Sequence, residues 1–462
     1  MLQESVVRRV LEAALQTGGD FSEIFAEDTE HNSVRMLDGV VETATYSRSR
    51  GAGVRVFKGT RSVYATTADL SEDALLKTAQ AAAAALEGTP EGTARVFRVA
   101  RYAPALPVTL AEVDNARRAA YLRRGTQAIR EESDEITQII AKMRDWNQRV
   151  LICNSEGVWA EDIRPRVNLV LSAVAMSGAE AQTGLAVHGF GGGYERLDSL
   201  DVEADARAAA RSAVTMLHAP ECPAGYMPVV IESGRGGVIF HEACGHSLEA
   251  TSVAKGNSEF CGKLGQRIAA PCVTALDDGM LPGEWGSLRV DDEGTPSARR
   301  VLIENGILRS YMVDRLGSRL MNTPVTGNSR RESYEYAPTS RMTNTFIAPG
   351  TDDEDEMIRT MGDGLFAKSL GGGSVNPLTG EFNFSVDEGY LVRDGKIQTP
   401  VRGATLVGKG SEILMQIDRV GSRLELDSSG QCGSISGWVP VDVGQPRIRV
   451  KGLTVGGKGG TL

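Results

Sequence analysis

Hydrophobic residues recur with helical spacing at the start of the chain and again at three later points. From Ser5 to Gln16 the apolar side chains fall on one face of a helix, and Gly18-Gly19 follows as a stop signal. The same spacing predicts helices over residues 73–86, 110–132 and 202–217.

Strand-like stretches fill much of the sequence between these helices, and several are joined by turn dipeptides. Asp38-Gly39 separates two such stretches and strongly predicts a hairpin, while Lys58-Gly59 predicts another. Asn305-Gly306 and Asp394-Gly395 predict hairpins in the second half. The acidic run at 352–356 is interpreted as a solvated helix start, because negative charge favours a helix N-terminus.

The pattern changes along the chain from mixed helices and strands to short strands with glycine-rich turns, the change falling at Met227. We therefore predict an α+β protein, with a mixed α/β N-terminal region followed by a β-rich C-terminal catalytic domain. Three domains are expected: residues 1–92, an N-terminal α/β domain; residues 93–222, a central α/β region; and residues 223–462, the β-rich catalytic domain.

The most informative chemistry lies in a short segment that holds two of the five histidines, His241-Glu242-Ala243-Cys244-Gly245-His246. Neutral imidazoles bind zinc well, and a carboxylate beside the first one can take a proton from water that the metal activates. The motif therefore indicates hydrolysis at a metal ion.

The two histidines are five residues apart, one more than in the familiar zinc-peptidase helix. Five steps of about 100° would splay the rings by about 140° on a regular helix. A π-bulge would absorb the extra residue, and Gly245 is a plausible place for it. Residues 227–231 predict a strand, 233–237 a turn and 238–249 a helix; without Gly-Lys-Ser/Thr, this segment does not indicate phosphate binding.

Two histidines do not complete a catalytic zinc site, which usually has three protein ligands. The third could be Glu249, Cys244, another histidine or a residue from the C-terminal part. Cys432 stands out because its loop, residues 428–434, is rich in glycine and serine and leaves a thiolate uncrowded; taken alone, it could equally be an inert small hydrophobe.

Collinear motifs along nearly the whole chain resemble the TldD/PmbA family, metallopeptidases once described as modulators of DNA gyrase, and in particular the TldD-type subunit that retains H-E-x-x-x-H. The matching segments are Ala14 to Asp20, Asp38-Gly39, Gly51 to Val56, His241 to Ala243, Gly245-His246, Leu248-Glu249, Arg341 to Thr345, Val439-Pro440, Val443 to Pro446 and Leu453 to Gly457.

The resemblance implies that His241, His246 and Cys432 hold a zinc ion and that Glu242 is the general base. It implies a metallopeptidase that hydrolyses unfolded or short extended peptides inside the cleft of a dimer, either a homodimer or a heterodimer with a PmbA-type paralogue. Glu249 is followed by Ala-Thr where many relatives have Gly-Asp, which affects the expected substrate range. Glu249 itself could support His246 or be an ordinary carboxylate.

Composition narrows the expected partners and location. A formal net charge of −10 and a pI near 5.3 argue against broad nucleic-acid binding. No apolar run is long enough to span a membrane, and the N-terminus predicts an amphipathic helix rather than a signal peptide. Six dispersed cysteines show no disulfide framework, so we expect a cytoplasmic protein.

Two other functional classes stay open at this point. A thiol enzyme could use Cys244 or Cys432 as nucleophile with a motif histidine as base, although neither spacing explains Glu242. The chain could instead be a non-catalytic or regulatory subunit of a peptidase complex. The remaining histidines have no ligand spacing and are interpreted as structural or surface residues: His31, His188 and His218.

Overall fold

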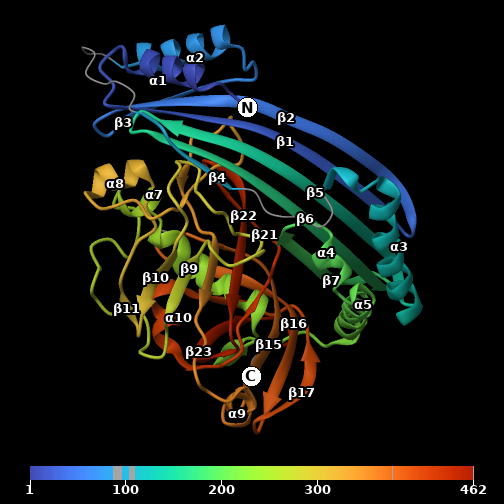
Figure 1. The fold of residues 1–462 in the computed structure, drawn as a ribbon. Helices are drawn as coiled ribbons and strands as arrows, with labels where there is room; N and C mark the ends of the chain where they lie inside the picture. The colour runs from blue at the N-terminus through green and yellow to red at the C-terminus, as the bar shows by residue number, and fades with distance from the viewer. Residues whose placement is uncertain (87–95, 103–109, 377, 461–462) are drawn as a thin grey trace.

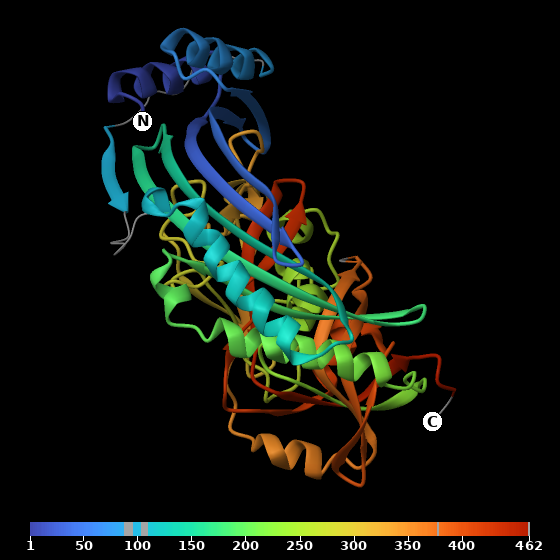
Figure 2. The same ribbon diagram turned by 90° about the vertical axis from the view of Figure 1, so that its right-hand side faces the viewer.

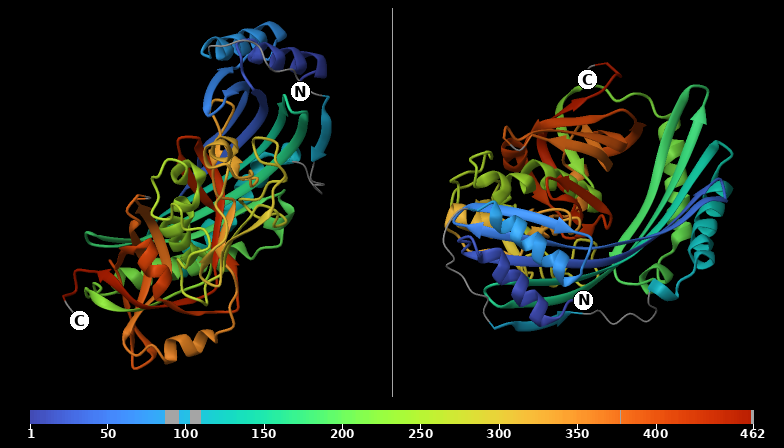
Figure 3. Two further views of the ribbon diagram at one scale, coloured as in Figure 1. Left: turned by 90° about the vertical axis from the view of Figure 1, so that its left-hand side faces the viewer. Right: turned by 90° about the horizontal axis from the view of Figure 1, so that it is seen from above.

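A long, curved antiparallel sheet wraps around a β-rich C-terminal region in the computed structural model, which describes residues 1–86, 96–102, 110–376 and 378–460 (Figures 1 and 3). Helices cover the outer face of this sheet, and the C-terminal region lies against its inner face (Figure 2). The predicted α+β class, with a mixed N-terminal region and a β-rich C-terminal region, is confirmed.

The curved sheet has the strand order β3-β2-β1-β5-β6-β4, with β7 beside β6, and only β4 is parallel to its neighbour. Its strands are β1 (Phe21–Leu37), β2 (Val40–Lys58), β3 (Arg61–Thr67), β4 (Arg98–Tyr102), β5 (Ile136–Asn154), β6 (Val158–Ser177) and β7 (Glu180–Gly191). The accompanying helices are α1 (Glu4–Leu15), α2 (Glu72–Ala84), the short turn η1 (Leu110–Glu112), α3 (Asn115–Glu132), α4 (Glu195–Asp198) and α5 (Val202–His218).

Strand alternation decides which side chains of the curved sheet meet helices and which meet the C-terminal region. On β5, Ala141 and Met143 belong to a core formed with α3 and α5. Trp146, at an even-numbered position of the same strand, points the other way and packs edge-on against Trp285 of the C-terminal region, with ring centroids 5.2 Å apart. Beyond the bulge at the start of β5, its even-numbered residues therefore face inward, toward the C-terminal region.

The C-terminal region contains two seven-stranded sheets and one short hairpin. One sheet has the order β11-β10-β9-β14-β22-β20, with β21 beside β22. In the other, β15, β8, β23, β18 and β16 form a closed ring because β16 also pairs with β15; β17 and β19 extend it. Closure removes exposed strand edges, and the sheet packs against the segment that carries the histidine motif.

The bounds of these elements follow. The strands are β8 (Gly225–Ile231), β9 (Ala275–Asp278), β10 (Arg299–Glu304), β11 (Ile307–Leu308), β12 (Ser329–Arg330), β13 (Thr339–Ser340), β14 (Asn344–Ile347), β15 (Gly364–Val375), β16 (Glu381–Arg393), β17 (Lys396–Val401), β18 (Thr405–Lys409), β19 (Ile417–Val420), β20 (Glu425–Leu426), β21 (Gly430–Ser434), β22 (Gly437–Gln445) and β23 (Ile448–Gly456). The helical pieces are η2 (Gly234–Gly237), α6 (Val238–Phe240), η3 (His241–Gly245), η4 (His246–Leu248), α7 (Ala250–Val253), α8 (Arg315–Met321), α9 (Glu354–Arg359) and α10 (Gly410–Gln416).

The predicted hairpins are all present. Asp38, Asn305 and Asp394 adopt φ near +50°, the left-handed conformation that these turn dipeptides tolerate. The helix expected from residue 110 begins later, because Asp114 caps it by accepting from the backbone N–H of Arg117. The acidic run begins α9 as predicted. The boundary expected at 87–92 lies outside the described residues.

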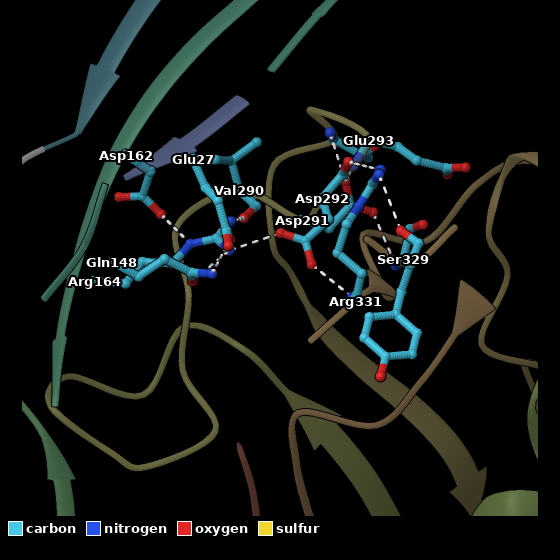
Figure 4. Close-up of polar contacts among 12 residues, drawn as sticks. Glu27, Gln148, Asp162, Arg164, Val290, Asp291, Asp292, Glu293, Ser329 and Arg331 are labelled. Carbon is cyan, nitrogen blue, oxygen red and sulfur yellow. Dashed lines mark hydrogen bonds and ion pairs between the residues drawn. The ribbon is translucent and has the colours of Figure 1, made fainter. Parts of the chain in front are cut away.

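A buried network of ion pairs joins the curved sheet to the C-terminal region. Arg331 donates to Glu23 of β1 (3.1 Å) and to the backbone carbonyl of Asp292 (2.8 Å). Arg164 of β6 bonds Asp292 and Asp162 at 2.6 and 2.9 Å (Figure 4). Burial alone raises the pKa of Glu23, but the nearby arginine charges outweigh it and lower that pKa. The curved sheet and the C-terminal region therefore meet through buried charged groups. Removing one partner would leave the other buried without an opposite charge.

Replacing Arg331 with methionine is expected to lower the free energy of unfolding by roughly 3–5 kcal/mol, because it leaves buried carbonyl and carboxylate groups short of a partner. Arg359→Met is the control: it breaks a largely exposed pair with Glu356 and should cost about 0–1 kcal/mol. Urea denaturation measures both. Equal losses would show that the interface network contributes no more than a surface pair.

All six cysteines are free thiols. No helix within the described ranges is long and apolar enough to cross a membrane.

Candidate metal centre

The histidine motif sits on a broken helical segment that follows a central strand of the ring-shaped sheet. Strand β8 ends at Ile231, and the chain then turns through η2 into α6 and η3. Buried Ile239, Phe240 and Leu248 anchor the segment in the C-terminal core. Anchoring on apolar side chains leaves the polar side chains of the motif free to meet on another face.

The extra residue between the histidines is absorbed as predicted, by a π-helical turn. The N–H of His246 donates to the carbonyl of His241, a bond across five residues. A Cβ at position 245 would collide with the thioether of buried Met342, so glycine lets this side chain pack directly against the turn. As a result the centroids of the His241 and His246 imidazole rings lie 4.9 Å apart, and the two ring planes form an angle of 82°. The helix predicted for 238–249 is divided into α6, η3 and η4, and it ends before Glu249, which is extended.

Three residues distant in sequence converge here: one ligand atom each from His241, His246 and Cys432 lies within 4.8 Å of the others. The Sγ of Cys432 is 3.3 Å from Nε2 of His246. Cys432 lies on strand β21, opposite Val439 of β22, so the predicted loop is instead a short hairpin strand. Pairing with β22 fixes where the thiol points, which a loop would not.

The electrostatics of this cluster favour the thiolate form of Cys432. Burial opposes ionisation of Cys432, but the charges and hydrogen bonds of His241 and His246 outweigh it and lower the pKa of the thiol to about 3. The thiolate is the form that binds metals. Burial lowers the pKa of His246, whereas Glu249 and Cys432 raise it, with a net rise.

Glu242 projects beside the cluster rather than into the core. Its Oε2 is 3.8 Å from Nε2 of His246, and its side chain is 21% exposed, so it can reach both the cluster and solvent. That position suits a group that exchanges protons with water.

Glu249 and Arg341 support the cluster from behind. Oε2 of Glu249 is 3.3 Å from Nδ1 of His246, the typical position of a carboxylate that orients a metal-binding imidazole. Fully buried Arg341 lies 3.8 Å from the other oxygen of Glu249 and donates to the backbone carbonyl of Cys432 at 2.6 Å. The Arg341 guanidinium therefore contacts both the carboxylate beside His246 and the backbone of Cys432.

Changing Glu249 to glutamine is expected to weaken metal affinity by about 10–100-fold, because the neutral amide holds the His246 ring less firmly and no longer raises its basicity. Competition with a chromogenic chelator measures the affinity. Glu221→Gln, an exchange away from the cluster, should leave it unchanged. An affinity unaltered by Glu249→Gln would assign this carboxylate a packing role only.

The other residues considered as ligands lie elsewhere. Cys244 is fully buried, and burial raises the pKa of its thiol, which disfavours metal binding and nucleophilic attack. His188 and His218 lie beside Asp205 and Glu135, and His31 packs near Trp146. The role of Arg341 was not predicted, because no local spacing connects it with Cys432, 91 residues away.

The chain matches three family domains in succession. Residues 22–86 match the PmbA/TldA metallopeptidase domain 1, residues 109–217 the central domain, and residues 224–457 the C-terminal domain. Among curated relatives, the Metalloprotease TldD homolog of Haemophilus influenzae is 36% identical over 451 residues, covering 95% of this chain and 93% of that protein. A protein named Metalloprotease from Methanothermobacter thermautotrophicus is 32% identical, covering 95% and 96%.

Solved structures share the fold at lower sequence identity. A protein described as a putative modulator of a DNA gyrase, from Thermotoga maritima, aligns with a TM-score of 0.79 at 20% identity, covering 98% of this chain and all of that one. TldE from Thermococcus kodakarensis aligns with a TM-score of 0.75, also at 20% identity, covering 98% and 99%.

Proposed function

Since the chain belongs to the PmbA/TldD metallopeptidase family, we propose that it is a zinc-dependent peptidase with its catalytic residues in the segment 223–462. The observation that carries this proposal is the convergence of His241, His246 and Cys432 beside Glu242. Imidazole and thiolate ligands together favour zinc over magnesium or calcium.

The donor set fits one tetrahedral zinc ion. Bonds of about 2.0–2.3 Å place ligand atoms about 3.4–3.8 Å apart, and the three here lie within 4.8 Å of one another. Nδ1 of His241 is buried and has no hydrogen-bond partner among the described residues, as expected of an imidazole near a cation site. Three protein ligands leave a fourth position for water or substrate.

When bound, zinc would supply Lewis acidity toward water and toward the scissile carbonyl. Glu242 then accepts a proton from the attacking water and delivers it to the leaving amine. Glu249 and Arg341 hold His246 and the backbone of Cys432 in position while this proton moves. Neither of them needs to touch the substrate.

We further propose that the substrates are unfolded or short extended peptides, enclosed in the cleft of a homodimer or of a heterodimer with a PmbA-type paralogue. The fold shared with TldE supports the heterodimer as one form. Backbone pairing with an exposed strand would explain weak side-chain selectivity. Six free thiols suit a reducing compartment such as the cytoplasm.

The proposed substrate class is tested by comparing how fast the enzyme cleaves one protein in its folded and unfolded states. The zinc-loaded enzyme is expected to degrade a destabilised, unfolded variant of a small globular protein at least about tenfold faster than its folded parent, because cleavage of a folded chain tracks its small open population. Mass spectrometry follows the fragments. Equal rates on both states would contradict the enclosed site.

A further inference from the structure

A cavity of about 730 Å³ lies between the inner face of the curved sheet and the β21–β22 hairpin that carries Cys432. Alternation places Arg144 of β5 and Arg166 of β6 on this inner face. Arg330 reaches the cavity from the C-terminal region, and Gln431, next to Cys432, forms part of the hairpin wall. The cavity therefore borders the strand that carries one of the proposed zinc ligands.

Three of the arginines that line the cavity have no carboxylate partner among the described residues. Within the part of the chain that the structure describes, Arg166 donates to the backbone carbonyls of Trp285 and Ser287, at 2.9 and 3.0 Å. Arg330 donates to the carbonyl of Met342 at 2.7 Å. Arg144 donates to the side-chain amide oxygen of Asn168 at 2.9 Å, and its buried Nε has no hydrogen-bond partner in the described ranges.

These arginines differ from the paired ones beside them. Arg164 and Arg331, which also line the cavity, belong to the ion-pair network with Asp162, Asp292 and Glu23. Figure 4 labels both arginines together with Asp162 and Asp292. Arg166 and Arg330 are 3% and 4% exposed, so water screens them little. Burial, together with neighbouring arginines, lowers the pKa of Arg166 to about 9 and that of Arg330 to about 10.

The carboxylates around the cavity do not neutralise the three arginines. Asp145 is bound by Arg118 and by the hydroxyl of Tyr194, and Asp292 by Arg164. Glu27 accepts from Gln148, and burial raises its pKa to about 7, which reduces its charge near neutral pH. Glu332 and Glu335 also line the cavity, and Glu332 accepts from the backbone N–H of Trp438. Within the described residues, none of these carboxylates forms an ion pair with Arg144, Arg166 or Arg330.

We propose that this cavity binds carboxylate groups of an extended peptide substrate, so that the enzyme prefers peptides that carry carboxylates. The inference rests on the proposed peptidase function. Guanidinium groups bind carboxylates through paired, charge-assisted hydrogen bonds. The cationic groups come from three separate segments around a volume far larger than one small anion, which suits a peptide segment.

The position of the cavity connects it with the metal centre. Gln431 lines the cavity, while the next residue, Cys432, turns its thiol to the opposite side of β21. The cavity and the metal centre therefore lie on opposite faces of the β21–β22 hairpin.

The test uses three synthetic peptides of equal length: a neutral one with an amidated end, the same peptide with two glutamates, and the neutral one with a free C-terminal carboxylate. Hydrolysis is measured with the zinc-loaded wild-type chain, and equilibrium binding by fluorescence anisotropy with the zinc-loaded Glu242→Gln chain. Either carboxylate peptide, or both, is expected to bind roughly 10–100-fold more tightly than the neutral one. Which one does so identifies the source of the carboxylate.

Three substitutions test whether the preference for carboxylate peptides arises in this cavity. Arg144→Gln should abolish it, and so should Ser33→Glu, which places a carboxylate opposite Arg144 on β1 without removing a buried group. Arg149→Gln, an exposed arginine on the other face of β5, should preserve it. Equal binding of all three peptides, or a preference that survives Ser33→Glu, overturns the inference. If none of the peptides is hydrolysed, the proposed peptidase function is refuted. The binding measurement still shows whether the cavity prefers carboxylates.

Discussion

Replacing Glu242 with glutamine is expected to lower kcat for peptide hydrolysis by about 10²–10⁴-fold while zinc stays bound. The amide has nearly the same shape as the carboxylate but cannot accept the proton of the attacking water. The three proposed ligands, His241, His246 and Cys432, remain in place, so affinity for the metal should change little. Steady-state hydrolysis of an unstructured peptide and metal analysis of the same sample measure the two effects.

Glu412→Gln provides the matched control for this experiment. Glu412 is an exposed carboxylate on α10, and its replacement should leave both hydrolysis and zinc content unchanged. If the Glu242→Gln enzyme retained wild-type kcat, a different group would have to serve as base and the assignment would be wrong. Loss of zinc together with activity would make Glu242 a determinant of metal binding rather than of proton transfer.

Removing the thiol of Cys432 is the second change with a large expected effect. In Cys432→Ala only the two imidazoles remain, and zinc content should fall from about one ion per chain to well below that, with hydrolysis lost in parallel. Because the thiol is held as a thiolate by His241 and His246, its removal also takes away the negative charge that attracts the cation. Mass-spectrometric metal analysis after dialysis gives the stoichiometry.

Cys272→Ala is the control for the loss of a thiol. This cysteine is exposed, outside the cluster, and its replacement should leave zinc content and hydrolysis unaltered. A Cys432→Ala chain that still bound a full equivalent of zinc would mean that another residue completes the site, and Glu249 would then be the first to test because it already contacts His246.

The parts of the fold that local chemistry controls could be predicted from the sequence. Turn dipeptides such as Asp38-Gly39 determine hairpins within a few residues, and the helix pattern of residues 202–217 reappears in α5. The π-helical turn was predictable because the five-residue spacing of His241 and His246 can bring both rings to one side only if one residue is absorbed.

The rest depends on contacts between residues far apart in the chain. Cys432 was expected in a loop because glycine and serine disfavour regular structure, but pairing with β22 makes that segment a strand. Arg341 supports the cluster through one contact with Glu249 and one with the backbone of Cys432, and neither follows from spacing. The unpaired arginines likewise became visible only once Arg144, Arg166 and Arg330 were placed around one cavity.

The central claim, that this chain hydrolyses peptides at a zinc ion held by His241, His246 and Cys432, is tested most directly by removing and restoring the metal. Hydrolysis of an unstructured peptide is measured before chelation, after chelation and dialysis, and after one equivalent of zinc is returned. We expect activity before chelation, its loss after chelation and dialysis, and its recovery in proportion to the zinc that is bound again. Full activity in the metal-free chain would contradict it and would point to Cys432 acting as a thiol nucleophile.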